Sequence, residues 1–243
     1  MAQGSVNTAS VGQSEDLAAY LAPSEFIDSD SPTVTEYAQW AAAGATTDLE
    51  RALKLYYAVR DDIRYDPYGF DTSRKGFRAS QCLALKRGFC ITKAALLAAC
   101  ARAIGLPARV GYGDVRNHLA TKKLLEIMGT DLFVFHGYTQ MLIDGRWVKA
   151  TPAFNKALCD RFGVKPLEFD GHTDSLFHPF DTSGRKHMEY VNERGEYADV
   201  PFDEIMTVWA EMYSESGVET GFAVPGADFH AEAAAERAWV SGG

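Results

Sequence analysis

Cys90 lies at the predicted start of a helix, in the stretch KRGFCITKAALLAACARAIGLPARVGYG, residues 86–113. The start of a helix has unpaired backbone N–H groups and the positive end of the helix dipole, and both favour a thiolate over a thiol. Cys90 is therefore a candidate nucleophile. The alternative is a small buried thiol with a packing role, as expected for Cys100 in the same apolar run.

His136 follows 46 positions later on a predicted strand, and Thr151 lies on the next strand. A thiol near its ordinary pKa is mostly protonated at neutral pH, so nucleophilic catalysis needs an imidazole to take the proton and a third group to hold the ring. The three residues have the spacing of such a site. A strand histidine on its own is more often a hydrogen-bonded structural residue, so the pair carries more weight than either member.

Capping residues and helical periodicity predict the elements around Cys90. The run after Cys90 carries only Lys93 and Arg102 as charges, which predicts a helix buried in the core and ended by Gly105-Leu106-Pro107. The predicted helices cover residues 32–43, 47–62, 80–87 and 90–104, and a strand is predicted at residues 108–115.

A hairpin is predicted where Asp144-Gly145, the preferred dipeptide of a type I′ turn, separates two apolar runs. A two-residue loop places Ile143 opposite Arg146 and Tyr138 opposite Thr151. His136 then shares a face with Tyr138 and Thr151, and becomes a diagonal neighbour of Thr151 at about 7 Å between their backbones.

The chain after Pro152 is rich in loops, with a short helix predicted at 155–161 and a strand or hairpin at 188–201 around Arg194-Gly195. A helix is predicted at 203–213. The last segment, 228–240, has helix-forming composition and is expected to pack loosely.

Composition and charge limit the classes of protein to which this chain can belong. The 243 residues, 47% of them hydrophobic, carry a formal net charge of −9, which disfavours binding to nucleic acid or to an anionic membrane. We expect a loose polar arm at residues 1–14 and a single domain over 15–243, with a loop-rich and helical C-terminal extension.

Four cysteines without a CxxC pair argue against a zinc site or a disulfide framework, and no apolar run is long enough to span a membrane. His172, His178 and His187 have no ligand spacing, so no metal and no cofactor are expected. We therefore expect a soluble, cytoplasmic protein with reduced thiols.

The motifs GFCITKAALLAACARAIGLPARVGYG and FHGYTQMLIDGRWVKATPAF resemble the core of the transglutaminase-like superfamily. In that core a G-x-C helix ending in G-[IL]-P-A-R is followed by an H-x-[WY]-x-[EQ] strand and a W-V-x-x-[DT]-P strand. The upstream YYAVRDDIRYD resembles the helix and extended segment that precede them, and the resemblance covers residues 32–155. It implies an α+β, papain-like fold in which the Cys90 helix packs on an antiparallel sheet, with Cys90 as nucleophile and His136 as base.

The third catalytic position departs from the family pattern, which usually has aspartate before the proline of the second strand, where this chain has Thr151. A hydroxyl can accept a hydrogen bond from the imidazole but cannot stabilise imidazolium by charge. Three interpretations stay open: Thr151 serves, Asn155 turns back to serve, or the site is inactive. Because a thiolate itself offsets the imidazolium charge, we favour an active site.

Four further residues are candidates for substrate or oxyanion contacts. Gln81 could supply an oxyanion donor, although capping or lining a nearby helix is the simpler role. Tyr138 and Trp147 could wall a substrate groove, although aromatic residues in a hairpin usually pack. His118 could line the cleft or lie on the surface.

The predicted reaction is cysteine-dependent acyl transfer on the amide bond of a peptide or protein, with Cys90 attacking and His136 protonating the leaving group. The resemblance favours hydrolysis through an acyl-enzyme over transglutaminase-type cross-linking to an amine. A catalytically inactive peptide-binding module is the alternative from another class, and the sequence leaves the oligomeric state open.

Overall fold

The computed structural model describes residues 17–118, 120–177, 188–213, 217 and 221–241, so the arm expected at residues 1–14 lies outside the described part of the chain. The helices are α1 Pro32–Ala41, α2 Asp48–Asp62, α3 Ala79–Leu85, α4 Cys90–Ala103, α5 Lys122–Met128, α6 Lys156–Phe162, α7 Phe202–Met212 and α8 Phe229–Ser241. The strands are β1 Arg64–Tyr65, β2 Arg87–Gly88, β3 Ala108–Asn117, β4 Leu132–Ile143, β5 Arg146–Ala150 and β6 Met188–Tyr197.

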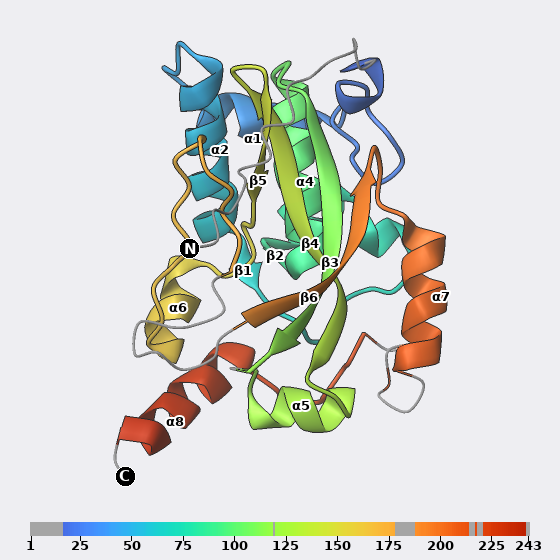
Figure 1. Ribbon diagram of the computed structural model, residues 1–243, viewed down its shortest axis with the longest axis vertical. Helices are drawn as coiled ribbons and strands as arrows, with labels where there is room; N and C mark the ends of the chain where they lie inside the picture. Colours follow the sequence, from blue (N-terminus) through green and yellow to red (C-terminus); the bar gives the residue numbers. More distant parts are fainter. Residues whose placement is uncertain (1–16, 119, 178–187, 214–216, 218–220, 242–243) are drawn as a thin grey trace, which may run out of the picture.

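An antiparallel sheet of strand order β5-β4-β3-β6 forms the centre of the fold, with α4 behind it in Figure 1. In this view α2 lies at the left of α4 and α1 lies behind, and both contact α4, while α7 flanks the β6 side and α5 lies at the lower end of the sheet. A separate parallel pair, β1 with β2, leads into the start of α4. The expected α+β fold, with the cysteine helix packed on an antiparallel sheet, is confirmed.

The helix α4 is buried because its side chains are almost all apolar: every residue from 91 to 102 is buried. Its lysine is accommodated by backbone acceptors, because Lys93 Nζ donates to the Ile63 carbonyl at the end of α2. Burial lowers the pKa of Lys93 to about 7. On the sheet side, Thr139 Oγ1 donates to the Ala94 carbonyl at 2.8 Å, which fixes α4 against β4.

The predicted hairpin register is confirmed, with Ile143 paired to Arg146 and Thr139 paired to Ala150. Asp144 and Gly145 have φ of 49° and 75°, as a type I′ turn requires.

The segment 188–201, predicted as a strand or a hairpin, is a strand, β6, because its backbone pairs along β3 from Val110 to Asn117. Two elements differ from the sequence expectation. The helix α5, which Thr121 caps by accepting the Leu124 N–H, was not predicted. The final helix α8 does not pack loosely at its start, where its first residues are buried and its neighbour is α6.

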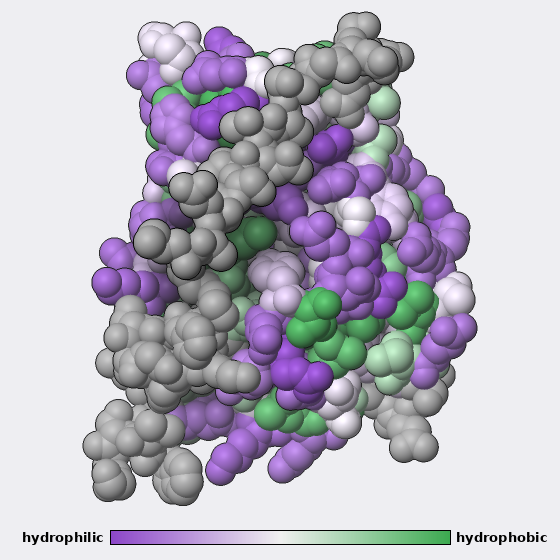
Figure 2. All heavy atoms as spheres, in the orientation of Figure 1, coloured by the Kyte–Doolittle hydropathy of each residue, from purple (hydrophilic) through white to green (hydrophobic). Residues whose placement is uncertain are grey.

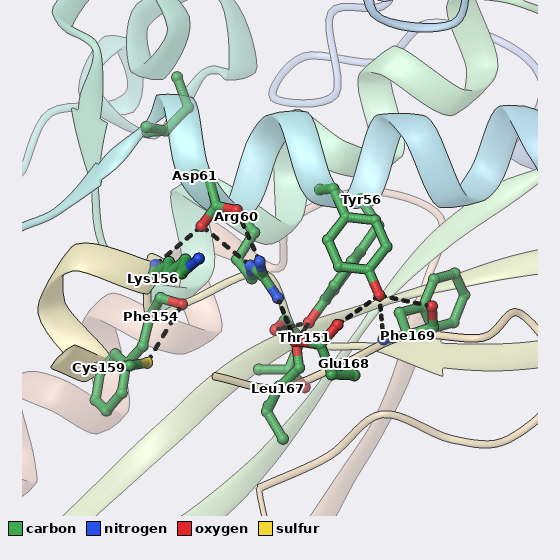
Figure 3. A network of polar contacts seen from close by, with 12 residues as sticks. Tyr56, Arg60, Asp61, Thr151, Phe154, Lys156, Cys159, Leu167, Glu168 and Phe169 are labelled. Carbon is green, nitrogen blue, oxygen red and sulfur yellow. Dashed lines mark hydrogen bonds and ion pairs between the residues drawn. The ribbon is translucent and has the colours of Figure 1, made fainter. Parts of the chain in front are cut away.

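A polar network ties the segment after β5 to the helix α2, as Figure 3 shows. Tyr56 donates its hydroxyl to the carbonyls of Thr151 and Leu167, at 3.2 and 2.9 Å. Arg60 also donates to the Leu167 carbonyl, at 2.7 Å, and Asp61 accepts the Lys156 N–H at 2.9 Å. These bonds explain why a loop-rich segment holds one position beside α2.

None of the helices in the described part of the chain combines the length and the apolar character that crossing a membrane requires.

Candidate active site

Cys90 is the first residue of α4, and its side chain is partly buried. The helix start is held by Thr92, whose Oγ1 accepts the Phe89 N–H at 3.1 Å. Burial raises the pKa of Cys90 to about 11, although backbone N–H groups of Gly137, Ile91 and Cys90 itself bond the sulfur and oppose the rise. At neutral pH the group is therefore a thiol surrounded by donors that would stabilise a thiolate once formed.

The strand β4 approaches the start of α4 at Gly137. A Cβ added there would lie 3.0 Å from Ile91 Cα and 3.1 Å from the Cys90 carbonyl oxygen, both backbone atoms. Glycine is thus needed for the close approach that brings the Gly137 N–H to the sulfur. The same contact brings His136, the preceding residue, to the start of α4, where the candidate nucleophile Cys90 lies.

His136 is 4% exposed, and burial lowers its pKa to about 4, so the imidazole is neutral at neutral pH. Its Nδ1 lies 3.4 Å from the Tyr190 hydroxyl of β6, and its ring meets Phe177 edge-on at 5.5 Å between centroids. Its Nε2 is buried with no hydrogen-bond partner among the described residues. The resting pair is a neutral thiol and a neutral imidazole rather than the ion pair of a preformed thiolate.

An irregularity in β4 directly before His136 sets the direction of the ring. Phe135 has φ of 58°, and the pairing of β3 with β4 shifts register between Gly113 and Val115. Because of this shift Asp114 has no partner residue on β4. Its carboxylate accepts the Phe135 N–H at 3.1 Å and pairs with Arg194 Nε at 2.5 Å. A bulge of this kind commonly re-aims a side chain next to an active site.

Neither residue expected to orient His136 makes a hydrogen bond to its imidazole. Thr151 Oγ1 is buried and has no hydrogen-bond partner in the part of the chain that the structure describes, although its proximity to Tyr190 opposes the rise that burial causes in the Tyr190 pKa. The Asn155 amide oxygen accepts the Tyr65 N–H at 3.1 Å and so holds β1. The structure instead brings Tyr190 to the ring, from a strand that carries no sequence signal for this role.

Cys90 and His136 line one pocket of about 60 Å³. It lies at the lower end of the sheet, between the start of α4 and the helices α5 and α7. The other residues that line the pocket were not predicted from the sequence, because they come from segments far apart in the chain. They are Tyr65, Pro67, Phe70, Phe89, Val115, Asn117, Leu124, Met128, Phe133, Val134, Met188, Trp209, Tyr213 and Phe222. Figure 2 shows a group of hydrophobic side chains on the viewed face over the lower part of the sheet, near the place of β3 and β6 in Figure 1.

The other predicted contact residues lie elsewhere in the described structure. Gln81 lines a second cavity, next to Gly88 and separated from the first by Phe70 and Phe89. His118 pairs with Glu189, at 3.6 Å.

Tyr138 and Trp147 belong to the sheet face that turns away from α4. Lys149 Nζ lies 4.9 Å from the centre of the Tyr138 ring, and the Arg109 guanidinium lies 4.3 Å from that of Trp147. Gly111 provides room for Tyr138, whose ring atoms would meet an added Cβ at 2.3 Å. The two aromatic residues thus pack with cations in the structure.

Among the described residues there is no group of three or more His, Cys, Asp or Glu side chains arranged to hold a metal ion.

A cysteine at a helix start and a histidine on an antiparallel sheet, both lining one pocket, form an arrangement typical of cysteine enzymes with an α+β core. Residues 35–152 match the family model of the Transglutaminase-like superfamily. This region, which contains Cys90, His136 and Thr151, is a transglutaminase-like domain.

Two solved structures are similar to the chain. A candidate cysteine protease from Cytophaga hutchinsonii is 20% identical, with a TM-score of 0.45 over 58% of this chain and 43% of that one. A candidate protease from Parabacteroides distasonis is 13% identical, with a TM-score of 0.36 over 52% of this chain and 26% of that one. The chain thus spans less than half the length of each. A search of the curated proteins finds no match.

Proposed function

We propose that the protein hydrolyses an amide bond of a peptide or protein through an acyl-enzyme on Cys90. The observation that carries this proposal is the buried Nε2 of His136, which has no hydrogen-bond partner among the described residues and lies in a pocket that His136 shares with Cys90. A purely structural histidine would satisfy that nitrogen within the fold, since leaving a buried polar atom unpaired is costly. An unpaired nitrogen beside a thiol is suited to proton transfer with the thiol and with a substrate.

The first half of the reaction forms the acyl-enzyme. The Cys90 thiol passes its proton to His136 as Sγ bonds to the substrate carbonyl carbon. The imidazolium then gives that proton to the amide nitrogen as the C–N bond breaks and the amine leaves. The N–H groups of Gly137 and Ile91 that bond the sulfur stabilise the negative charge that develops on Sγ as the thiol gives up its proton.

The second half releases the acid. Water gives a proton to His136 as its oxygen bonds to the thioester carbonyl, and the imidazolium returns the proton to Cys90 Sγ as the C–S bond breaks. His136 is neutral at both starting points, as a base must be, because burial holds its pKa at about 4. Tyr190 keeps the ring oriented through its bond to Nδ1.

The test is acyl-enzyme trapping with N-acetyl-alanine 4-nitrophenyl ester, acid quenching and intact mass measurement. We expect the wild type to gain one acyl group on Cys90 and to lose it by hydrolysis. Cys90→Ala should gain none, and His136→Ala should be acylated at least 100-fold more slowly. Cys100→Ala is the matched control, because it removes a thiol of the same helix, one that is fully buried.

Adding glycinamide during turnover separates water from amine acceptors. Release of acid alone supports hydrolysis, whereas accumulation of acyl-glycinamide would assign amine transfer instead. A folded wild type that is never acylated on Cys90 would overturn the proposal and favour the inactive binding module.

A further inference from the structure

The pocket that holds Cys90 and His136 is otherwise almost entirely apolar. Its other polar side chains are Asn117, Tyr65, Trp209 and Tyr213. The Trp209 indole N–H donates to the Val134 carbonyl at 3.4 Å, and the hydroxyl of Tyr213 is also committed. That hydroxyl accepts the Val134 N–H at 2.8 Å and donates to the Leu132 carbonyl at 3.0 Å. A polar guest would therefore lose its hydrogen bonds to water with little to replace them.

We infer that this pocket binds an aliphatic side chain on the acyl residue of the substrate, so that the enzyme selects amides whose scissile carbonyl follows an apolar residue. The inference rests on the proposed function. A group in the pocket must be attached within a few bonds of the atom that Cys90 attacks, because the sulfur is part of the same wall. The volume of about 60 Å³ holds roughly four to six water-sized groups, since one water molecule needs about 10–15 Å³ of cavity volume in this measure, so the guest is a short chain of about that many heavy atoms.

Phe222 closes the pocket with a strained backbone. Its φ is 55°, a left-handed conformation that a bulky residue rarely adopts, and its ring lies 5.8 Å from Phe70 and 6.0 Å from Tyr213 between centroids. The neighbouring Gly221 accepts the Gly69 N–H at 2.7 Å. Strain of this kind persists where the surrounding structure holds it, and here it sets an aromatic ring in the pocket wall.

The first test is the kcat/KM of N-acetyl-Xaa 7-amido-4-methylcoumarin amides in which Xaa is Gly, Ala, norvaline, norleucine or Gln. We expect a rise of about fourfold per added methylene up to norleucine. The glutamine compound, which is of similar length but polar, should be at least tenfold below norleucine. Turnover that depends on Cys90 but is insensitive to chain length, or that favours glutamine, would overturn the inference and leave the proposed function standing.

A variant locates the selectivity. Phe222→Ala enlarges the pocket, so it should raise kcat/KM for an acyl residue one or two methylenes longer than norleucine relative to norvaline. Trp40→Ala is the control, since this aromatic residue of α1 is 65% exposed and outside the pocket. If kcat/KM depended on chain length in the same way in Phe222→Ala and Trp40→Ala, this would contradict the placement of the acyl side chain in the pocket beside Phe222.

Binding to an inactive variant separates failure of the chemistry from failure of the pocket. In Cys90→Ala, N-acetyl-norleucinamide should change the tryptophan fluorescence through Trp209, which lines the pocket, whereas N-acetyl-glutaminamide at the same concentration should not. The Trp209→Phe form of this variant should lose the signal. Binding without turnover of any substrate by the wild type would overturn the proposed function only, and equal response to both amides would overturn the inference.

Discussion

Acid should destabilise this protein in part through His136. Burial holds the imidazole pKa at about 4 in the folded chain, against 6.5 for an ordinary histidine. Below pH 6.5 the unfolded chain binds a proton that the folded chain does not. The stability that this difference contributes is complete above pH 6.5 and is lost as the pH falls through 4. Between pH 7 and pH 4 the loss is about 3 kcal/mol, at 1.36 kcal/mol for each pH unit that separates the two values.

The measurement is urea unfolding followed by tryptophan fluorescence at pH 7 and pH 4, in the wild type and in His136→Gln. Other groups also titrate over this range, so the informative quantity is the difference between the two proteins. The wild type should lose about 3 kcal/mol more free energy of unfolding than the variant. His172→Gln, which changes an exposed histidine, should behave as the wild type does. An equal loss in wild type and His136→Gln would refute the buried neutral imidazole on which the mechanism depends.

Two further predictions concern how His136 and the nucleophile are held. Tyr190→Phe removes the hydroxyl at Nδ1 of His136 and should lower kcat about tenfold without a matching change in KM, whereas Tyr197→Phe on the same strand should not. Steady-state kinetics over pH 5–9 test this, and equal kcat values in the two variants would contradict it. Gly137→Ala should lower stability by about 1–3 kcal/mol, because its Cβ meets Ile91 backbone, and should slow acyl-enzyme formation. Wild-type acylation by this variant would be evidence against the close approach.

The features that depend on neighbouring residues could be predicted from the sequence. The start of α4 at Cys90 follows from a run of apolar residues, and the β4–β5 register follows from the Asp144-Gly145 turn. Both are local, because a helix pairs backbone groups four residues apart and a two-residue turn aligns its own strands. The candidate pair of Cys90 and His136 was found for the same reason, through motifs on these elements.

Only the tertiary structure decided what surrounds the pair. Tyr190 reaches His136 from 54 positions downstream, through the pairing of β6 with β3, whereas the expected partner Asn155 holds Tyr65. The protonation states of Cys90 and His136 could not be predicted from the sequence either. The helix start favours a thiolate, but desolvation by walls drawn from across the chain is the larger effect and leaves Cys90 protonated. Sequence determines which groups are available, and long-range packing sets their dielectric surroundings and partners.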